Sequence, residues 1–257
     1  MGKVVSVHSF RGGTGKSNIT ANVSAQFAKM GKRVGVIDTD IQSPGIHVLF
    51  GMDEEKIDKA LNDYLWGRCA IEETAYDVGA RLGTGEVVVM SGGIYLIPSS
   101  IRAGEIARVL REGYDVGLLN DGFRALLDKL SLDYLFIDTH PGLNEETLLS
   151  VAISDVLIII LRPDQQDFQG TAVTVDVSRK LEVPNLYMVV NKALTSYDFD
   201  DLRKQIEGLY NAPVATILPL SEDVARMQSA DLFSLRYPDH PFSEGIRNIV
   251  AAIEAAD

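Results

Sequence analysis

A glycine-rich segment near the N-terminus carries the strongest chemical signal in the sequence. Residues 11–17 read Arg-Gly-Gly-Thr-Gly-Lys-Ser and follow the apolar run Val4–Val7. In such a loop the backbone N–H groups turn inward around phosphate oxygens, and the N-terminus of the next helix adds partial positive charge. The segment therefore predicts a phosphate-binding loop, in which Lys16 reaches the β- and γ-phosphates and the Ser17 hydroxyl ligates Mg²⁺.

The loop departs at one position from the common phosphate-binding template, G-x-x-x-x-G-K-S/T. Phe10 stands where the template has its first glycine. The alternative interpretation is a glycine-rich turn that only caps a helix. A Gly-Lys-Ser sequence between a strand and a helix makes that alternative the weaker one.

Two acidic segments follow other predicted strands. Residues 38–40 read Asp-Thr-Asp after the run Val34–Ile37, and residues 138–142 read Asp-Thr-His-Pro-Gly after Tyr134–Ile137. Because the carboxyl ends of parallel strands meet at one ligand crevice, we expect these acids beside the phosphate loop. A single acid at a strand end is often only a turn residue. Three acids in this relation to one phosphate loop favour a functional site.

These acids match what the hydrolysis of a Mg²⁺–triphosphate requires, namely oxygen ligands for the metal and a polar group that orients the attacking water. Asp138 is the predicted acid of the metal shell. The backbone N–H of Gly142 is the predicted donor to a γ-phosphate oxygen.

The hydropathy pattern indicates the elements that must position these residues. Short runs rich in Val, Ile and Leu, without polar alternation, are typical of strands buried on both faces of a parallel sheet. Segments of helical period separate them, and the first is predicted to end at Gly31. The sequence thus predicts a doubly wound α/β fold with a mostly parallel sheet and helices on both faces. The predicted strands are Val4–Val7, Val34–Ile37, Tyr134–Ile137, Val156–Leu161, Leu186–Val190 and Val214–Leu218.

Residues 51–130 are less regular. Apolar spacing predicts helices over Ile57–Leu65, around residues 106–110 and over residues 123–130, with strand-like segments at Val87–Met90 and Tyr95–Ile97. No linker, internal repeat or low-complexity tract sets this region apart. We therefore expect residues 1–257 to form a single domain in which 51–130 is an elaborated region.

Composition limits the classes of function. The chain has 257 residues, of which 46% are hydrophobic and 23% charged, so it can bury a large core. Its net charge of −12 argues against a whole-surface electrostatic grip on nucleic acid or anionic lipid. No apolar run approaches the roughly 18 residues that span a bilayer, and no signal peptide is visible. We expect a cytoplasmic protein.

Cysteine and histidine usage points away from a metal centre built from these side chains. The single Cys69 excludes an intrachain disulfide and a multi-cysteine metal site within one chain. The four histidines show no metal-ligand spacing and are interpreted as ordinary loop or strand-end residues.

Taken together, the loop RGGTGKS, the Asp-Thr-Asp segment and the segment DTHPG resemble the ParA/MinD group of deviant Walker-A ATPases. The usual loop of that family is K-G-G-x-G-K-S/T, so Arg11 stands at its signature lysine. Weaker similarities continue through residues 92–100, 154–166, 189–192 and 217–224, and only the central part of 51–130 is poorly covered.

The resemblance implies an ATP-sandwich homodimer that forms with ATP, hydrolyses it slowly and then falls apart, with a protein activator or cargo adaptor as partner. Lys16, Asp40 and Arg11 are the catalytic residues it implies, with Asp40 positioning the water and Arg11 crossing the dimer to the partner's phosphates. The alternative for Arg11 is that it serves only its own subunit or faces solvent. Ser17, Asp38 and Asp138 are the implied ligands of Mg²⁺. The implied nucleotide-binding residues are Gly12, Gly13, Thr14, Gly15, Lys16, Ser17, Asn18, Gly142, Asn191 and Pro219, with Asn191 at the adenine.

The choice of base can be argued from one position. A guanine-reading N-K-x-D motif needs an acid three residues after Asn191, and this sequence has Leu194 there. ATP is therefore favoured over GTP.

Three classes of function stay open. The first is a positioning or partition ATPase that cycles between monomer and dimer. The second is a nucleotide-gated scaffold with little hydrolysis, given Phe10 and Arg11. The third is a metal-cluster carrier of the Mrp type, for which residues 38–51 show some similarity, but such carriers bridge a cluster with two cysteines per subunit and Cys69 is alone.

Contacts with a membrane or with DNA are less well supported. Residues 249–257 carry acids and no lysine, so their apolar stripe predicts core packing rather than a membrane-binding helix. DNA tethering through Arg179 and Lys180 or through Arg203 and Lys204 stays open, although basic pairs are usually solvated helix faces and the net charge does not favour it.

Overall fold

The computed structural model describes residues 2–81 and 91–256. Within these ranges the chain forms an eight-stranded sheet of order β3-β4-β2-β5-β1-β6-β7-β8. All neighbouring strands pair in parallel except β3 and β4, which are antiparallel. The strands are β1 (Lys3–His8), β2 (Val34–Asp38), β3 (Tyr76–Asp77), β4 (Ile94–Ile97), β5 (Tyr134–Asp138), β6 (Val156–Leu161), β7 (Asn185–Ala193) and β8 (Val214–Pro219).

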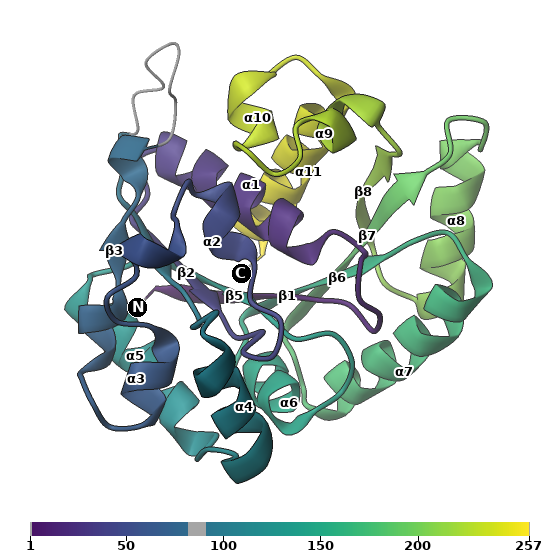
Figure 1. Cartoon of the computed structure of the whole chain (residues 1–257). Coiled ribbons are helices and arrows are strands. Elements are labelled where there is room, and N and C mark those ends of the chain that lie inside the picture. The colour runs from purple at the N-terminus through teal and green to yellow at the C-terminus, as the bar shows by residue number, and fades with distance from the viewer. Residues whose placement is uncertain (1, 82–90, 257) are drawn as a thin grey trace.

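Helices cover both faces of this sheet (Figure 1). One layer contains α1 (Lys16–Lys29), α2 (Ile46–Leu49), α9 (Glu222–Arg226), α10 (Phe233–Arg236) and α11 (Pro241–Ala255). The other contains α3 (Leu61–Leu65), α4 (Ala103–Glu112), α5 (Gly117–Lys129), α6 (Glu145–Ala152), α7 (Gln165–Lys180) and α8 (Phe199–Tyr210). The predicted doubly wound α/β fold is confirmed; that residues 1–257 form a single domain stays a prediction.

Successive strand residues point into alternate layers, and this divides the core. Val5 and Val7 of β1 pack with α1 and α11, whereas Val4 belongs to the cluster on the opposite face. Each central strand therefore needs apolar side chains on both faces, which explains its unbroken run of Val, Ile and Leu.

The helix after the glycine-rich loop begins and ends at glycines. Gly15 precedes α1 with φ 97°, and Gly31 follows it with φ 91°. Both values lie in the left-handed region that favours glycine. The helix end predicted at Gly31 is confirmed.

The C-terminal helix α11 packs inside the molecule. Phe242, Ile246, Ile249 and Ile253 are buried in the cluster that also contains residues of α1 and β8. The prediction that this apolar stripe serves core packing is confirmed.

The less regular region agrees with the sequence in part. The strand predicted at Tyr95–Ile97 is present as β4, and the helices predicted around 106–110 and over 123–130 correspond to α4 and α5. The strand predicted at Val87–Met90 lies outside the described residues. The helix predicted over Ile57–Leu65 is wrong in its first part, because only α3 is an α-helix and a single 3-10 turn, Glu54–Lys56, precedes it.

Side chains hold the residues before α3 in an extended path. The Tyr76 hydroxyl accepts from the N–H of Lys59 at 2.8 Å and donates to its carbonyl at 2.9 Å. The Asp63 carboxylate accepts from the N–H of Ala60 at 2.9 Å. These bonds satisfy backbone groups that a helix would otherwise pair, so the stretch does not need to be helical. Its apolar residues are buried by tertiary packing instead.

Candidate functional site

The predicted site residues lie at one edge of the sheet, at the switch point where the order of the strands reverses. Strand β1 lies between β5 and β6, and β5 separates it from β2. Val7 is in register with Asp138, and Asp138 is in register with Asp38. The carboxyl ends of β1, β5 and β2 therefore lie side by side, where ligands bind in open α/β sheets.

The glycine-rich loop connects β1 to α1 at this edge. Gly13 and Gly15 have φ values of 75° and 97°, so the loop needs glycine at both positions. Helix α1 has no side-chain cap at its N-terminus and no acidic residue in its first turn. Its free N–H groups and positive dipole end are thus available to an anion, and Lys16, only 7% exposed, lies in the same turn.

Phe10 has a packing role that explains the missing template glycine. A Cβ atom added to Gly170 of α7 would lie 2.0 Å from Cδ1 of the Phe10 ring. The ring therefore rests directly on the backbone of α7, and this contact fastens the start of the loop to the layer opposite α1.

Two buried carboxylates lie beside the loop. Asp38 is 0% exposed and Asp138 is 1% exposed. Asp138 Oδ1 lies 3.4 Å from the Thr20 hydroxyl of α1, which donates to it. Asp38 accepts from the backbone N–H of Asp40 at 3.0 Å and of Gly45 at 3.2 Å, so it also fixes the loop that follows β2.

The pKa values of these acids reflect burial of negative charge. Burial raises the pKa of Asp138 to about 6, although Lys16 and the Ser17 hydroxyl act in the opposite direction. Burial, followed by the charge of Asp138, raises the pKa of Asp38 well above its usual range. Burial also raises the pKa of Asp40, against the opposing effects of His140 and Lys16. The chain alone therefore stabilises the charged form of these acids poorly, and a bound cation would favour that form.

This donor set fits Mg²⁺. The ion prefers oxygen ligands and is usually held by one or two carboxylates together with phosphate and water oxygens. Asp138, Asp38 and the Ser17 hydroxyl would supply those ligands. Among the described residues no group of three or more His, Cys, Asp or Glu side chains could hold a metal ion, so phosphate oxygens would have to complete the shell.

A threonine and a histidine fix the neighbouring strand ends. The Thr139 hydroxyl donates to the Val7 carbonyl at 3.0 Å, and the His8 Nδ1 atom lies 2.8 Å from the same hydroxyl oxygen. Because the hydroxyl hydrogen is already used, Nδ1 of His8 must be the donor. Burial, followed by the charges of Lys16 and His140, lowers the pKa of His8 to about 3.

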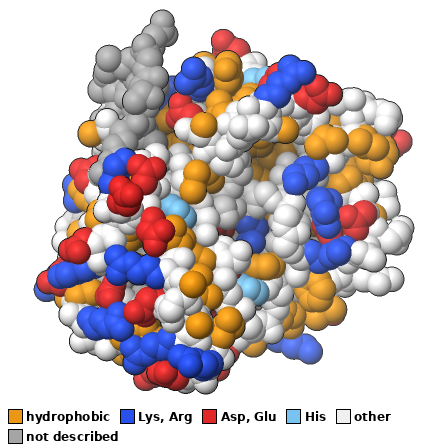
Figure 2. All heavy atoms as spheres, in the orientation of Figure 1, with side chains coloured by type: hydrophobic (Ala, Val, Ile, Leu, Met, Phe, Trp, Pro, Cys, Tyr) orange, Lys and Arg blue, Asp and Glu red, His pale blue; other side chains and the backbone are white. Residues whose placement is uncertain are grey.

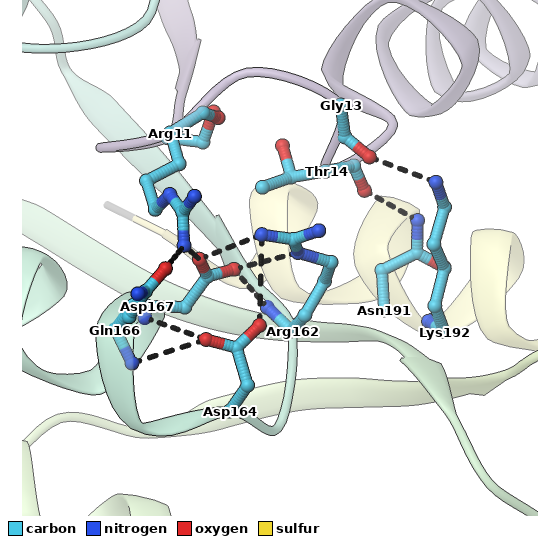
Figure 3. A network of polar contacts seen from close by, with 10 residues as sticks. Arg11, Gly13, Thr14, Arg162, Asp164, Gln166, Asp167, Asn191 and Lys192 are labelled. Atoms are coloured by element: carbon cyan, nitrogen blue, oxygen red, sulfur yellow. Dashed lines mark hydrogen bonds and ion pairs between the residues drawn. The ribbon is translucent and has the colours of Figure 1, made fainter.

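Arg11 is held within its own chain (Figure 3). Its guanidinium donates to the Gln166 side-chain oxygen and lies 3.9 Å from Asp167 Oδ1. Asp167 in turn accepts from the Arg162 Nε and Nη2 atoms, each at 3.0 Å. The predicted contact of Arg11 with a partner subunit would require it to leave Gln166.

The side chains at the end of β7 contact the loop itself (Figure 3). Asn191 Nδ2 donates to the Thr14 carbonyl at 2.7 Å, and Lys192 Nζ donates to the Gly13 carbonyl at 2.8 Å. The adenine contact of Asn191 stays a prediction. Pro219 ends the adjacent strand β8, in register with Ala193.

The predicted site residues thus lie together at one edge of the sheet. Arg11 and Lys16 belong to the loop and the start of α1, and the strand ends contribute Asp38, Asp40 and Asp138. Sequence reasoning missed other side chains there. His140 approaches Asp40, Thr20 contacts Asp138, and Lys192 supports the loop. The Asn-Lys pair at the end of a predicted strand was a signal for Lys192, whereas nothing in the spacing marked His140.

The arginines considered for DNA tethering have structural contacts. Arg179 donates to the carbonyl of Asn211 at 3.1 Å and to that of Tyr210, and Arg203 donates to the carbonyl of Val214.

On the face shown in Figure 2, charges of both signs intermingle at the lower left and hydrophobic side chains gather at the upper right. Exposed apolar residues at the ends of β7 and β8 include Leu194, Tyr197 and Leu220.

Comparisons with known proteins show which proteins this chain resembles. A family model described as an AAA domain matches residues 2–193. An uncharacterized ATP-binding protein of Methanocaldococcus jannaschii is 26% identical over 258 residues, which is 100% of this chain and 89% of the relative. An iron-sulfur cluster carrier protein of Pyrococcus horikoshii is 30% identical over 192 residues, 73% of this chain and 60% of the relative.

The fold is shared with a solved structure, the septum site-determining protein MinD of Pyrococcus horikoshii complexed with Mg-ADP. The TM-score is 0.81 at 19% sequence identity, over 99% of this chain and 97% of the other. Fold and loop define a P-loop nucleoside-triphosphatase. Within that class the chain belongs to the ParA/MinD family of P-loop ATPases. None of the helices in the described ranges is long and apolar enough to cross a bilayer.

Proposed function

We propose that this protein is a cytoplasmic Mg-ATP hydrolase that cycles between a monomer and an ATP-sandwich dimer in order to position or partition a cargo. The observation that carries the proposal is the arrangement at the switch point. A buried lysine and an uncapped helix N-terminus lie at the same edge as two buried acids whose charged form the chain alone stabilises poorly. A Mg²⁺–triphosphate supplies both the anion for the helix and the cation for the acids.

In this proposal each side chain has a separate task. Lys16 and the loop N–H groups hold the β- and γ-phosphates, and Ser17, Asp138 and Asp38 hold the metal. Mg²⁺, when bound, neutralises charge that develops on the phosphates. Asp40, which is less deeply buried than Asp38, orients the water.

The proposed dimer rests on Arg11. Support comes from the position of Arg11 at the start of the loop and from its exposure, 41% of the side chain. An arginine there can donate two N–H groups to a partner's phosphate, whereas the family's lysine would bind the phosphate through a single ammonium group. A protein activator or cargo adaptor is expected to accelerate the slow turnover.

Two variants test the proposal in one experiment. Lys16→Ala should weaken ATP binding strongly, and Asp40→Ala should keep ATP binding but lose phosphate release. Binding is measured by calorimetry with Mg-ATP, and turnover by phosphate release. Wild-type ATP affinity in Lys16→Ala, or wild-type phosphate release in Asp40→Ala, would contradict the assignment of that residue.

The iron-sulfur carrier among the relatives supplies a second candidate function with its own test. Cys69 is partly buried, and burial raises the pKa of its thiol, which disfavours the thiolate that a cluster needs. We expect anaerobically purified protein to contain no stoichiometric iron or sulfide. Stoichiometric amounts of both that disappear in Cys69→Ser would favour the carrier.

A further inference from the structure

His140 faces the carboxylate that is proposed to orient water. Its Nε2 atom lies 3.8 Å from Oδ1 of Asp40, and the two side chains are 25% and 16% exposed. This distance is longer than a hydrogen bond. The imidazole and the carboxylate therefore lie opposite each other across a short gap at the carboxyl ends of β5 and β2.

The hydrogen position on the His140 ring follows from its other nitrogen. Nδ1 lies 2.7 Å from the carbonyl oxygen of Pro141. A carbonyl oxygen only accepts, so Nδ1 carries the hydrogen and donates it. In the neutral ring Nε2 is then an acceptor, and the Asp40 oxygen opposite it is an acceptor as well.

A second His–Asp pair in the chain has the opposite arrangement. Nδ1 of His240 accepts from the N–H of Phe242 at 3.0 Å, so its neutral ring carries the hydrogen on Nε2. That Nε2 lies 3.7 Å from Asp223 Oδ2, with its hydrogen on the nitrogen nearer the carboxylate. The pair at His140 and Asp40 differs because, with the imidazole ring neutral, both facing atoms are acceptors.

The surroundings hold both acceptors in place. The Thr147 hydroxyl donates to the His140 carbonyl at 3.2 Å, and Asn144 caps α6 by accepting from the Thr147 N–H at 2.8 Å. Asp40 Oδ1 accepts from the Ser43 N–H at 3.1 Å. A side-chain pair fixed in this way can select the orientation of a small molecule that lies beside the gap and bridges both atoms.

A molecule that donates two hydrogens satisfies both acceptors, and water is such a molecule. We propose that His140 acts with Asp40 to hold the water that attacks ATP, so that His140 is a second water-positioning residue. This inference rests on the proposed function, because it assigns a further residue to the same site.

The reaction balances as ATP plus water giving ADP, inorganic phosphate and a proton. The water oxygen forms a bond to the γ-phosphorus while the bond from that phosphorus to the β–γ bridging oxygen breaks. The bridging electron pair leaves with ADP. One hydrogen of the water stays on the phosphate, and the other leaves as a proton to solvent past the two acceptors.

Two substitutions separate this role from a structural one. His140→Asn places an amide near the Nδ1 position, which keeps the bond to Pro141 and removes the acceptor. His140→Gln places an amide oxygen near the Nε2 position. We expect kcat to fall roughly 10- to 100-fold in His140→Asn, because a displaced water loses its alignment, and to be partly retained in His140→Gln. ATP affinity, measured by calorimetry, should stay near the wild-type value in both.

A double variant and a matched control complete the test. His140→Asn added to Asp40→Ala should reduce kcat little further, since residues that act as a unit are not additive. The ATP-bound dimer of His140→Asn, followed by sedimentation, should persist longer than that of the wild type. His240→Asn is the control outside the site, because asparagine can still cap α11, and it should leave kcat unchanged.

The outcomes distinguish this inference from the proposed function. Wild-type turnover in His140→Asn would overturn the inference alone, as would equal losses in the two His140 variants together with weakened ATP binding. Phosphate release absent from the wild-type protein would overturn the proposed function and, with it, the role of His140.

Discussion

Lys16 is the cation on which the charge balance of the site depends. It is buried in the first turn of α1, and its charge opposes the burial effect that raises the pKa values of Asp138 and Asp40. A lysine in this position is stabilised by two kinds of anion, the carboxylates of the chain and the phosphates of a ligand. Nucleotide affinity and the state of the acids are therefore linked through one residue.

Replacing Lys16 should weaken ATP binding far more than it weakens the fold. A hydrogen bond to a charged group contributes about 1.5–3 kcal/mol, so the Kd for Mg-ATP should rise roughly 10- to 150-fold in Lys16→Ala. Lys29→Ala, at the other end of the same helix, is the control and should leave the Kd unchanged. Calorimetric titration measures both. Equal affinities of Lys16→Ala and wild type would remove Lys16 from the phosphate site.

His8 should make the fold sensitive to acid. Its folded-state pKa is lowered from 6.5 to about 3, so its contribution to stability is fully present above about pH 6.5 and is lost as the pH falls towards 3. Each unit of pH in that window changes the free energy of unfolding by about 1.4 kcal/mol. Between pH 7 and pH 5 the wild type should therefore lose about 2 kcal/mol more than His8→Gln.

Urea unfolding of both proteins at the two pH values measures that difference. The raised pKa of Asp138 acts in the opposite direction, because its contribution declines as the pH rises towards 6. The comparison between variants cancels this effect, since both proteins contain Asp138. Identical pH slopes in the two proteins would show that His8 is not held neutral.

At the scale of elements, the phosphate loop is fastened to both helical layers. Its C-terminal end continues into α1, and its N-terminal end rests on α7 through Phe10 and Gly170. The anchor at α7 also carries Gln166 and Asp167, the residues that hold Arg11. A shift of α7 would therefore displace the loop through two contacts, that of Phe10 with Gly170 and that of Arg11 with Gln166 and Asp167.

Gly170→Ala should destabilise the protein because the new methyl group overlaps the Phe10 ring. Overpacking of this kind costs about 1–3 kcal/mol. In Phe10→Ala/Gly170→Ala the methyl group has room, so the double variant should be more stable than the sum of the single effects predicts. Chemical denaturation of the four proteins in this cycle tests the contact. Additive effects would show that the ring and α7 are independent.

The sequence was sufficient for most strands of the sheet, but not for the edge strand β3 or for contacts between distant segments. Strands buried on both faces leave unbroken apolar runs, which is why β1, β2, β5, β6, β7 and β8 were predicted near their observed positions. The extended stretch before α3 depends on Tyr76, which is 17 residues from its partner Lys59 and so is not part of any local pattern of spacing. Likewise, neither the fit of Phe10 against Gly170 nor the approach of His140 to Asp40 follows from spacing along the chain.

At the scale of the whole molecule, Arg11 links the proposed dimer to a contact inside the single chain. If Arg11 binds a partner's phosphate, ATP and dimerisation are thermodynamically coupled, by about 1–3 kcal/mol or roughly 5- to 150-fold in the dimer constant. The bonds to Gln166 and Asp167 compete with that contact. In the free chain we therefore expect Arg11 to stay bound to Gln166, and to move to a partner's phosphate only when ATP and a second subunit are both present.

Variants of Arg11 and Gln166 should change dimerisation in opposite directions. In the Asp40→Ala background, Arg11→Ala should weaken the ATP-dependent dimer more than it weakens ATP binding by the monomer. Arg11→Lys should restore part of the dimer, because the charge remains. Gln166→Ala should strengthen the dimer, because it removes the competing bond within the chain. Equal dimer constants in all four proteins would show that Arg11 does not reach the partner.

Sedimentation velocity of Asp40→Ala with Mg-ATP, with Mg-ADP and without nucleotide tests most directly whether ATP brings two subunits together. The account predicts a dimer with Mg-ATP and a monomer under the other two conditions, and a monomer under all three when Lys16→Ala is added. A single species whose mass does not depend on the nucleotide would contradict it.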